Sequence, residues 1–312
     1  MIYTVTFNPA LDYVMNIDNL QMGEINKAKS EQINYGGKGI NVSAILSRLG
    51  IENTALGFIA GFSGDKLTEM LNDDGVNNDF VKLKNGCTRI NVKIQSDKET
   101  DINADGPNIQ KEDLEKLFEK LDRLKEQDFL VLAGSIPKSL PDNIYESILE
   151  HLKNKGIKFV VDATGDLLLN VLRFKPFLIK PNHHELGDLF GVRIEEFDDI
   201  VKYGQLLQEK GAENVLVSRG KHGAVLIDKQ GSIHKVGNVT GKIVSSVGCG
   251  DSMVAGFIAG YIESGSYSYA LKLGAACGNA TAFSHSLASK EEIGTMLESE
   301  YLNLGEDFNE NC

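Results

Sequence analysis

One short stretch, Val247-Gly248-Cys249-Gly250-Asp251-Ser252, holds residues whose types and spacing suit catalysis, and an apolar run follows it. Glycine permits the positive φ angles and close backbone approaches of a tight turn. Free N–H groups there, with the positive end of a following helix, make a concave site for phosphate or a developing oxyanion. Asp251 stands where it could take a proton from a hydroxyl group. The stretch indicates phosphoryl transfer onto an alcohol; a strand-to-helix turn capped by Asp251 is the structural alternative.

A second glycine motif, Gly36-Gly37-Lys38-Gly39-Ile40-Asn41, lies far upstream. Apolar residues at helical spacing follow it and stop at Gly50, which predicts a glycine loop leading into a helix. A lysine between glycines at a helix start suits an anionic ligand, although a flexible turn is the plainer interpretation. The spacing is not that of a Walker A motif, which disfavours a P-loop NTPase.

Helical patterns alternate with short apolar strands from residue 110 onward. The predicted strands lie at 129–135, 159–162, 177–182 and 214–218, and a β pair at 223–228 and 232–236 leads to the glycine turn at 247–252. Helices are predicted at 251–263 and 267–283, followed by a polar C-terminal tail. Repetition of helix and strand predicts a doubly wound, mostly parallel sheet flanked by helices, an α/β fold.

Four more polar stretches have the alternation of strands, at about 12–17, 29–36, 88–95 and 99–103. Alternation implies a sheet with one face wet or facing a ligand. We predict that these strands form a small lid sheet apart from the main one.

Polar side chains follow several strands of the main sheet. They are Ser135, Asp162, Asn182, Glu185 and Ser218. Open α/β sheets bind ligands at the carboxyl ends of their strands. Each residue alone could be a cap or turn residue, but together they predict a ligand-binding edge.

Composition narrows the function classes. The 312 residues are 42% hydrophobic and 24% charged, and 32 basic against 44 acidic residues give a formal net charge of −12. An acidic surface argues against non-specific binding of nucleic acid or anionic membranes. The four cysteines (Cys87, Cys249, Cys277 and Cys312) show no metal-binding spacing. With no apolar run of transmembrane length and no evident signal peptide, we expect a cytoplasmic protein.

These residues resemble the ribokinase-like (PfkB) family of carbohydrate kinases. The resemblance runs from Asn8-Pro9-Ala10-Leu11-Asp12 to about Ser284, with both glycine motifs in the expected order. The opening Asn-Pro-Ala-Leu-Asp and the stretch Thr100 to Pro107 are similar to the phosphosugar branch, which holds the 1-phosphofructokinases and, nearby, the tagatose-6-phosphate kinases. The resemblance implies a single ribokinase-like domain over residues 1–312, with the four lid strands inserted in it.

The resemblance also implies roles for individual residues. Asp251 matches the catalytic base, and Gly248, Cys249 and Gly250 match the turn whose N–H groups hold the transferring phosphoryl group. Many members have alanine at the position of Cys249; backbone groups make the contacts, so we expect little effect beyond sensitivity to thiol reagents. The residues implied for the sugar phosphate are Asp12, Gly37, Lys38, Asn41, Arg89, Asn103 and Ser135, with Arg89 and Lys38 on its phosphate.

The resemblance also implies which residues bind the nucleotide and its metal ion. The implied ATP contacts are Lys180, Asn182, Ser218, Gly220, Gly223 and Asn279. The Asn182-His183-His184-Glu185 stretch matches a motif that organises Mg²⁺ through water, with Glu185 as its carboxylate. Adjacent histidines on a helix cannot both face one ion, so we expect His183 and His184 to face solvent.

The activity implied is ATP- and Mg²⁺-dependent phosphorylation of fructose 1-phosphate at its 6-hydroxyl. Tagatose 6-phosphate and fructose 6-phosphate are alternative acceptors that the sequence separates poorly. A homodimer through the lid is also implied. A non-catalytic regulator that binds nucleotide or sugar phosphate is the alternative of another class. A Rossmann oxidoreductase would need G-x-G-x-x-G after the first strand, where Asn8-Pro9 stands instead.

Overall fold

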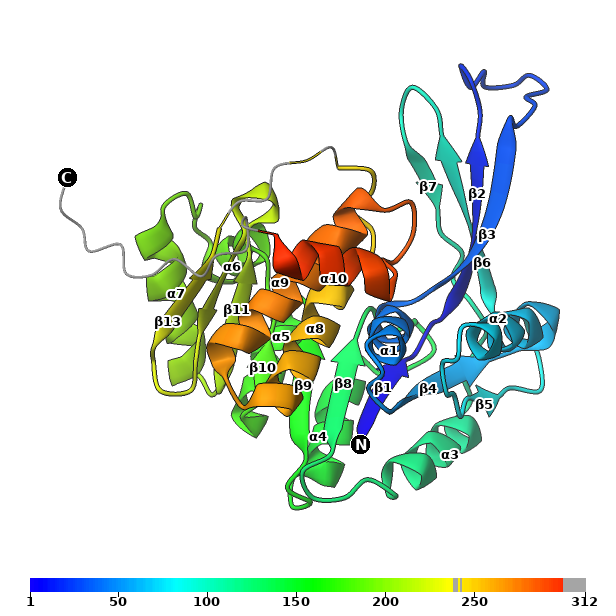
Figure 1. Cartoon of the computed structure of the whole chain (residues 1–312). Helices are drawn as coiled ribbons and strands as arrows, with labels where there is room; N and C mark the ends of the chain where they lie inside the picture. Colours follow the sequence, from blue (N-terminus) through cyan, green and yellow to red (C-terminus); the bar gives the residue numbers. More distant parts are fainter. Residues whose placement is uncertain (238–240, 242, 300–312) are drawn as a thin grey trace.

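A computed structural model of the chain describes residues 1–237, 241 and 243–299, and its largest feature is a nine-stranded sheet (Figure 1). The strand order is β13-β12-β11-β10-β9-β8-β1-β4-β5. The strands are β1 (Ile2–Thr6), β4 (Asn53–Ile59), β5 (Val81–Lys82), β8 (Phe129–Ala133), β9 (Lys158–Asp162), β10 (Leu178–Ile179), β11 (Asn214–Ser218), β12 (Ala224–Ile227) and β13 (Ile233–Val236). All neighbours from β11 through β5 pair in parallel, whereas β11, β12 and β13 pair antiparallel. This arrangement confirms the predicted mostly parallel sheet.

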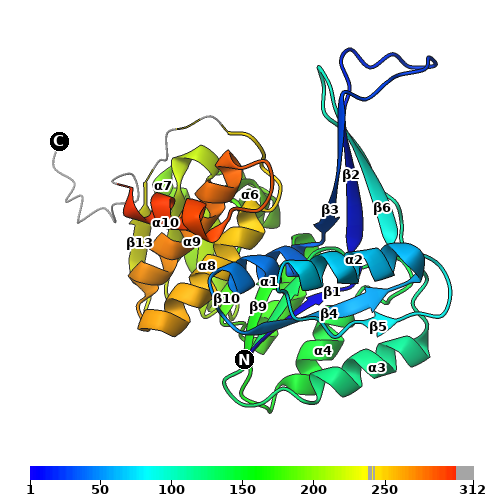
Figure 2. The same cartoon turned by 45° about the vertical axis from the view of Figure 1, so that its right-hand side comes forward.

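Helices cover both faces of the large sheet (Figures 1 and 2). One face packs against α1 (Lys38–Arg48), α8 (Cys249–Ser264), α9 (Tyr267–Phe283) and α10 (Lys290–Glu298). The other face packs against α3 (Lys111–Leu121), α4 (Ile144–Leu152), α5 (Gly165–Val171), α6 (His183–Phe190) and α7 (Phe197–Glu209). Successive residues of β8 point to opposite faces. Val131 packs in the core layer under α1, α8, α9 and α10, and Leu132 packs in the layer under α3 to α7.

Helices α8 and α9 pack closely against each other beside the site. A Cβ atom at Gly256 would lie 2.6 Å from the carbonyl oxygen of Leu273, so only glycine permits this approach. Phe257 and Ala276 are fully buried in the same layer. Burying one large apolar side chain contributes about 1.5–3 kcal/mol, and this packing fixes the start of α8.

The small sheet stands out from the body of the molecule (Figure 2). Its order is β3-β2-β6-β7, with β3 (Ser30–Gly36), β2 (Ala10–Asn16), β6 (Arg89–Gln95) and β7 (Thr100–Ile102). The pairs β3–β2 and β6–β7 are antiparallel and β2–β6 is parallel. Each strand lies within two residues of its predicted position. We refer to these four strands as the lid sheet.

Helix α10 was not predicted from the sequence, and no bounds were predicted for α6. Helix α10 occupies a segment predicted to be a polar tail, and α6, which carries His183 and His184, is separated from the end of β10 by three residues. Both begin with a capping box, Asn182 with Glu185 and Ser289 with Glu292. Such a reciprocal pair marks a helix start in sequence, so the signal was present. Helix α2 (Gly61–Asp73) and two 3₁₀ turns (Leu172–Phe174 and Gly220–His222) complete the described elements.

Three general features bear on function. None of the described helices is long and apolar enough to cross a membrane. Cys87, Cys249 and Cys277 are free thiols, whereas Cys312 lies outside the described residues. The division of the chain into one domain stays a prediction.

Candidate active site

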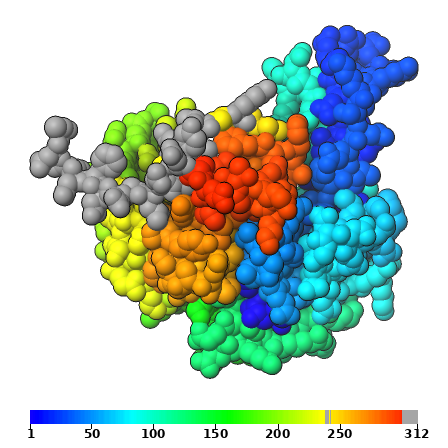
Figure 3. Space-filling view, viewed as in Figure 1, coloured from blue at the N-terminus to red at the C-terminus, as the bar shows by residue number. Residues whose placement is uncertain are grey.

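A cavity of about 1790 Å³ lies between the carboxyl edge of the large sheet and the lid sheet. Figure 3 shows the lid sheet, in blue and blue-green, rising beside the C-terminal helices in orange and red. The wall contains these predicted site residues: Asp12, Gly37, Lys38, Asn41, Arg89, Ser135, Lys180, Asn182, Glu185, Ser218, Gly220, Gly223, Gly248, Cys249, Gly250, Asp251 and Asn279. The fold thus gathers residues from distant parts of the chain into one site.

The turn at the start of α8 has the geometry of an anion-binding site. Gly248 is the N-cap residue, with φ 78°, a left-handed conformation that favours glycine. The first helical bond runs from the N–H of Ser252 to the carbonyl of Gly248 at 2.8 Å. The N–H groups of Cys249, Gly250 and Asp251 precede that bond and have no acceptor within the helix. Together with the helix dipole they form an electropositive concavity.

Asp251 lies in the first turn of α8 and is buried, with 5% of its surface exposed. The side-chain amide of Asn41, from α1, donates to its Oδ2 at 2.8 Å. Burial, followed by the negative charge of Asp162, raises the pKa of Asp251 to about 6. The Asn41 bond and the charges of Lys38 and Lys180 oppose this rise. A carboxylate with a pKa near 6 is ionised at neutral pH and basic enough to accept a proton.

Asp162 connects two lysines beside Asp251. Lys38 Nζ lies 3.3 Å from Asp162 Oδ2, and Lys180 Nζ lies 3.5 Å from Asp162 Oδ1. Burial lowers the pKa of Lys38, but the charges of Asp162 and Asp251 outweigh it and the net pKa is raised. Two carboxylates therefore balance two ammonium groups in the centre of the site. An unpaired charge at this depth would cost several kcal/mol.

Two cations of β6, Arg89 and Lys93, line the lid end of the cavity. Asp12 on β2 accepts from the amide of Asn91 at 2.8 Å and pairs with Lys93 Nζ at 3.2 Å. Arg89 lies on the same face of β6, and its Nε donates to the carbonyl of Asn8 at 3.1 Å. Burial lowers the pKa of Arg89 and Asp12 partly offsets this. No ion pair forms at Arg89 within the described part of the chain, so its charge is left for a ligand.

The opposite end is built by loops after β10 and β11. Asn182 caps α6 by accepting from the N–H groups of His184 and Glu185, and it makes a β-bridge with Ser218. Glu185 Oε2 accepts from the N–H of Asn182 at 2.8 Å. Across the residues described, the buried Nδ2 of Asn279 has no hydrogen-bond partner. A buried donor without a partner is costly, which suits a site that a polar ligand completes.

The donor set near Glu185 fits a magnesium ion held mainly by phosphates. Among residues 1–237, 241 and 243–299, no group of three His, Cys, Asp or Glu side chains could hold a metal. Mg²⁺ keeps several waters and needs only one or two carboxylates beside nucleotide phosphates. Glu185 supplies one carboxylate, with Oε2 used by the helix cap.

The prediction that both histidines face solvent was wrong for His183. His183 is half-buried and His184 exposed, both line the cavity, and their ring centroids lie 3.9 Å apart. Helix α6 begins at His183, so the Asn182 cap, rather than the position on a regular helix face, sets the direction of the two histidine side chains. Burial, followed by the neighbouring His184, lowers the pKa of His183 and favours its neutral form.

Asn103 is the predicted site residue that the cavity wall lacks. It is exposed just after the edge strand β7, and the backbone N–H of Ala104 donates to Asn91 at 3.2 Å. Asn91, with Lys93, takes the place expected for Asn103. Sequence reasoning missed both, although residues 89, 91 and 93 alternate on one strand face. From the sequence, Asp162 was placed at the ligand-binding edge of the sheet, and its ion pairs with Lys38 and Lys180 were not predicted.

Comparison with known proteins identifies the family. The profile of the pfkB family carbohydrate kinases matches residues 5–293. The chain belongs to the pfkB family of carbohydrate kinases. It is 43% identical to the 1-phosphofructokinase of Bacillus subtilis, over 95% of this chain and 97% of the relative. It is 37% identical to the D-tagatose-1-phosphate kinase of Bacillus licheniformis, over 94% and 96%.

Structural similarity agrees with the sequence relatives. Phosphofructokinase-2 from Escherichia coli, solved in complex with substrates and products, matches with a TM-score of 0.90 and 27% identity over 95% of this chain and 98% of that one. As a pfkB family member, the chain is a phosphotransferase with a sugar hydroxyl as acceptor. The oxidoreductase and the non-catalytic regulator are therefore not supported.

The first prediction concerns Asp251 as a base. A base works deprotonated, so kcat/KM should fall about tenfold per pH unit below a midpoint near pH 6. Asn41→Ala removes a bond that stabilises the carboxylate, so the midpoint should move to higher pH. Asn91→Ala is the control, since Asn91 bonds Asp12 instead. An unmoved midpoint in Asn41→Ala would contradict the assignment.

The second prediction concerns Cys249. Its thiol donates to the carbonyl of Ser245, and burial, then Asp251, raises its pKa to about 11. The thiol is protonated at neutral pH and therefore a poor nucleophile. Cys249→Ala should retain turnover within about twofold, since backbone N–H groups make the turn. Iodoacetamide at pH 7.5 should label exposed Cys87 first; faster loss of activity than Cys87 labelling would argue against this.

Proposed function

We propose that this chain transfers the γ-phosphate of ATP to the 6-hydroxyl of fructose 1-phosphate, giving fructose 1,6-bisphosphate and ADP. The observation that carries the proposal is Asp251, a buried, ionisable carboxylate at a helix N-terminus, in one cavity with Arg89 of the lid sheet. The relatives named 1-phosphofructokinase support this acceptor.

In the proposed reaction Asp251 accepts the proton of the 6-hydroxyl as its oxygen attacks the γ-phosphorus. The bond from phosphorus to the bridging oxygen breaks, and ADP leaves with the electron pair. The N–H groups of Cys249, Gly250 and Asp251 hold the oxygens of the transferring phosphoryl group. Catalysis then comes mainly from positioning and charge stabilisation.

Arg89 supports a phosphorylated sugar at the lid end. Lys93 pairs with Asp12, whereas Arg89 makes no ion pair among the described residues. The guanidinium of Arg89 therefore suits a phosphate dianion, to which it can donate two hydrogen bonds. Lys38, by contrast, is held by Asp162 beside Asp251. We therefore assign Lys38 to the transferring phosphoryl group rather than to the sugar phosphate.

The nucleotide and its metal fit the other end. ATP would lie along Lys180, Asn182, Ser218, Gly220, Gly223 and Asn279, whose unpartnered Nδ2 would gain an acceptor. Mg²⁺, held by the phosphates and by Glu185 through water, would neutralise phosphate charge. The two lysines near Asp251 are already balanced by carboxylates, so additional positive charge is needed there.

The second candidate acceptor is D-tagatose 1-phosphate, because a relative carries the name D-tagatose-1-phosphate kinase. This sugar is the C4 epimer of fructose 1-phosphate and keeps its phosphate at the same end. It replaces tagatose 6-phosphate as the closer alternative. Fructose 6-phosphate would have to enter in the opposite direction.

We further propose that the lid sheet closes over the sugar and pairs with a second lid in a homodimer. Ile33, Ile90 and Ile102 on three of its strands are exposed apolar side chains, and phosphofructokinase-2 from Escherichia coli has a tetrameric inhibited form.

We also propose that the protein is located in the cytoplasm. The three free thiols and the use of ATP support it.

The third prediction is the order of acceptors. With ATP and Mg²⁺ in a coupled ADP-release assay, kcat/KM should be highest for fructose 1-phosphate. D-tagatose 1-phosphate should follow, then fructose 6-phosphate and unphosphorylated fructose. A lead for tagatose 1-phosphate would keep the mechanism and change the substrate. A kcat/KM for unphosphorylated fructose equal to that for fructose 1-phosphate would contradict the proposed site for the sugar phosphate.

The fourth prediction tests that phosphate site. Arg89→Ala should raise KM for the phosphosugar on the order of 10- to 100-fold and change kcat less, because a charged hydrogen bond to the ground-state phosphate is lost. The matched control is Arg173→Ala, an exposed arginine paired with Glu146 away from the cavity. An unchanged KM in Arg89→Ala would exclude Arg89 from the phosphate site.

A further inference from the structure

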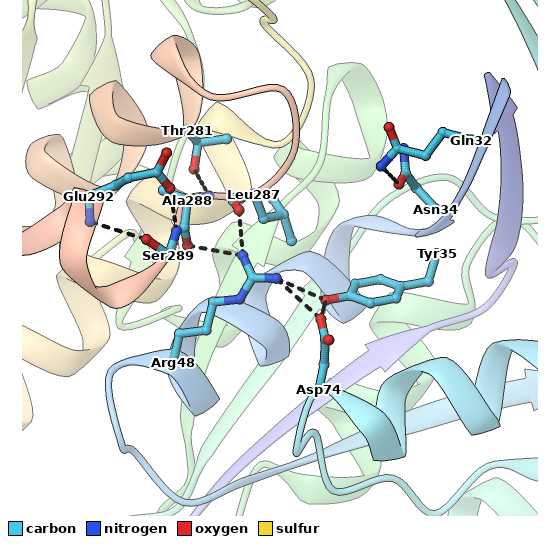
Figure 4. Close-up of polar contacts among 10 residues, drawn as sticks. All are labelled: Gln32, Asn34, Tyr35, Arg48, Asp74, Thr281, Leu287, Ala288, Ser289 and Glu292. Atoms are coloured by element: carbon cyan, nitrogen blue, oxygen red, sulfur yellow. Dashed lines mark hydrogen bonds and ion pairs between the residues drawn. The ribbon is translucent and has the colours of Figure 1, made fainter. Parts of the chain in front are cut away.

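Arg48, the last residue of α1, joins the root of the lid sheet to the segment that supports the catalytic turn (Figure 4). One guanidinium nitrogen donates to the carbonyl oxygens of Leu287 at 2.5 Å and Ala288 at 3.0 Å. The other donates to Tyr35 Oη at 3.4 Å and Asp74 Oδ2 at 3.2 Å. The arginine side chain is 23% exposed, so one planar group holds four acceptors in a partly desolvated position.

The first of these parts is the root of the lid sheet. Tyr35 lies next to last in β3, and its hydroxyl donates to Asp74 at 2.6 Å. Strand β3 pairs with β2 so that Tyr35 faces Leu11 and Asn34 faces Asp12. Asp12, the carboxylate at the sugar end, therefore lies on the strand pair that Arg48 contacts through Tyr35. Burial raises the pKa of Tyr35, followed by its bond to Asp74, and the hydroxyl remains a donor.

The second part is the turn that carries Asp251. The N–H of Ala288 donates to Thr281 Oγ1 at 3.2 Å, and Thr281 Oγ1 lies 2.9 Å from Ser252 Oγ. Thr281 and Ser252 are fully buried, and Ser252 directly follows Asp251. These bonds form a continuous chain from the guanidinium to the first turn of α8.

Leu287 adds an apolar contact to the same turn. A Cβ atom placed on Gly248 would lie 2.7 Å from Cδ2 of Leu287, so this side chain rests directly on the N-cap of α8. Arg48 holds the carbonyl oxygen of that same residue. A shift of this peptide would therefore be felt at the proposed anion-binding turn.

We propose that Arg48 is a positioning residue that couples the lid root to the catalytic turn. The inference rests on the proposed function, because it concerns how lid closure over a sugar phosphate affects phosphoryl transfer. When β3 moves with the lid, Tyr35 displaces the guanidinium relative to Asp74, the C-cap residue of α2. The guanidinium carries the Leu287–Ala288 peptide with it, which sets Thr281, Ser252 and the Gly248 turn.

Charge alone does not explain this arrangement. The Arg48–Asp74 pair is 23% and 41% exposed, and ion pairs at such positions contribute little to stability. Arginine adds a planar guanidinium group that donates hydrogen bonds to the acceptors of both segments at the same time. Lysine at this position keeps the charge and has no such fork, so Arg48→Lys separates the two explanations.

The test is a double-mutant cycle on kcat, with the sugar phosphate that the unaltered enzyme turns over best. Arg48→Lys and Thr281→Val should each lower kcat about tenfold and leave KM for ATP within about twofold. Because they break one chain of contacts, the double variant should also lose about tenfold. A loss of about a hundredfold, or an unchanged kcat in Arg48→Lys, would overturn the proposal. Thr281→Ser keeps the hydroxyl and should restore kcat.

A second measurement reports coupling without turnover. Binding of the sugar phosphate alone should slow amide hydrogen exchange at Ala288 in the unaltered enzyme, because its N–H bonds Thr281. This protection should be lost in Arg48→Lys; protection that persists would contradict the coupling. Since no phosphoryl transfer is involved, this result is independent of which acceptor proves to be the substrate.

Two variants guard against trivial explanations. Arg173→Lys changes an exposed arginine paired with Glu146 and should leave kcat unchanged. If Arg48→Lys fails to fold, as judged by thermal melting, Tyr35→Phe takes its place. That variant removes the hydroxyl shared by Arg48 and Asp74 and leaves both carbonyl bonds intact. It should lower kcat and remove the Ala288 protection, and failure to do so would overturn the proposal.

Discussion

The hydrogen bond from Asn41 to Asp251 is the contact on which the site depends, because it joins the two glycine motifs across 210 residues of sequence. Burying the Asp251 carboxylate is costly unless neighbouring groups compensate. Asn41 supplies one donor, and Lys38 and Lys180 supply positive charge around Asp162. Because these groups come from α1, α8 and the ends of β9 and β10, the site exists only when the helices pack on the sheet.

The two sheets divide the chemistry between them. The large sheet presents its carboxyl edge, where parallel strands bring loop residues together. The lid sheet adds Asp12, Asn91, Lys93 and Arg89 from two neighbouring strands, paired so that Asp12 lies opposite Asn91. In the proposed mechanism the lid sheet closes over this cavity before transfer, which would limit the loss of ATP to water.

Local signals in the sequence were sufficient for much of the fold. Apolar strands between helical patterns predicted the large sheet, and polar alternation predicted the lid strands to within two residues. Helix α10 was missed because its capping box was read as part of a tail, and the bounds of α6 were not predicted because its capping box was read as a metal motif. At Asn182 and Glu185 the same two side chains cap a helix and line the cavity, so the two interpretations are compatible.

The sequence by itself determined the glycine turns, the candidate base and the family, because residue type and local spacing carry that information. Only the tertiary structure decided which polar residues meet. It placed Asn91 and Lys93 beside Asp12 and left Asn103 exposed, because strand register is a property of pairing rather than of one strand. It also set the pairing of Lys38 with Asp162 and the contacts of Arg48 with Leu287 and Ala288. Such contacts join residues more than a hundred positions apart, and no local pattern encodes them.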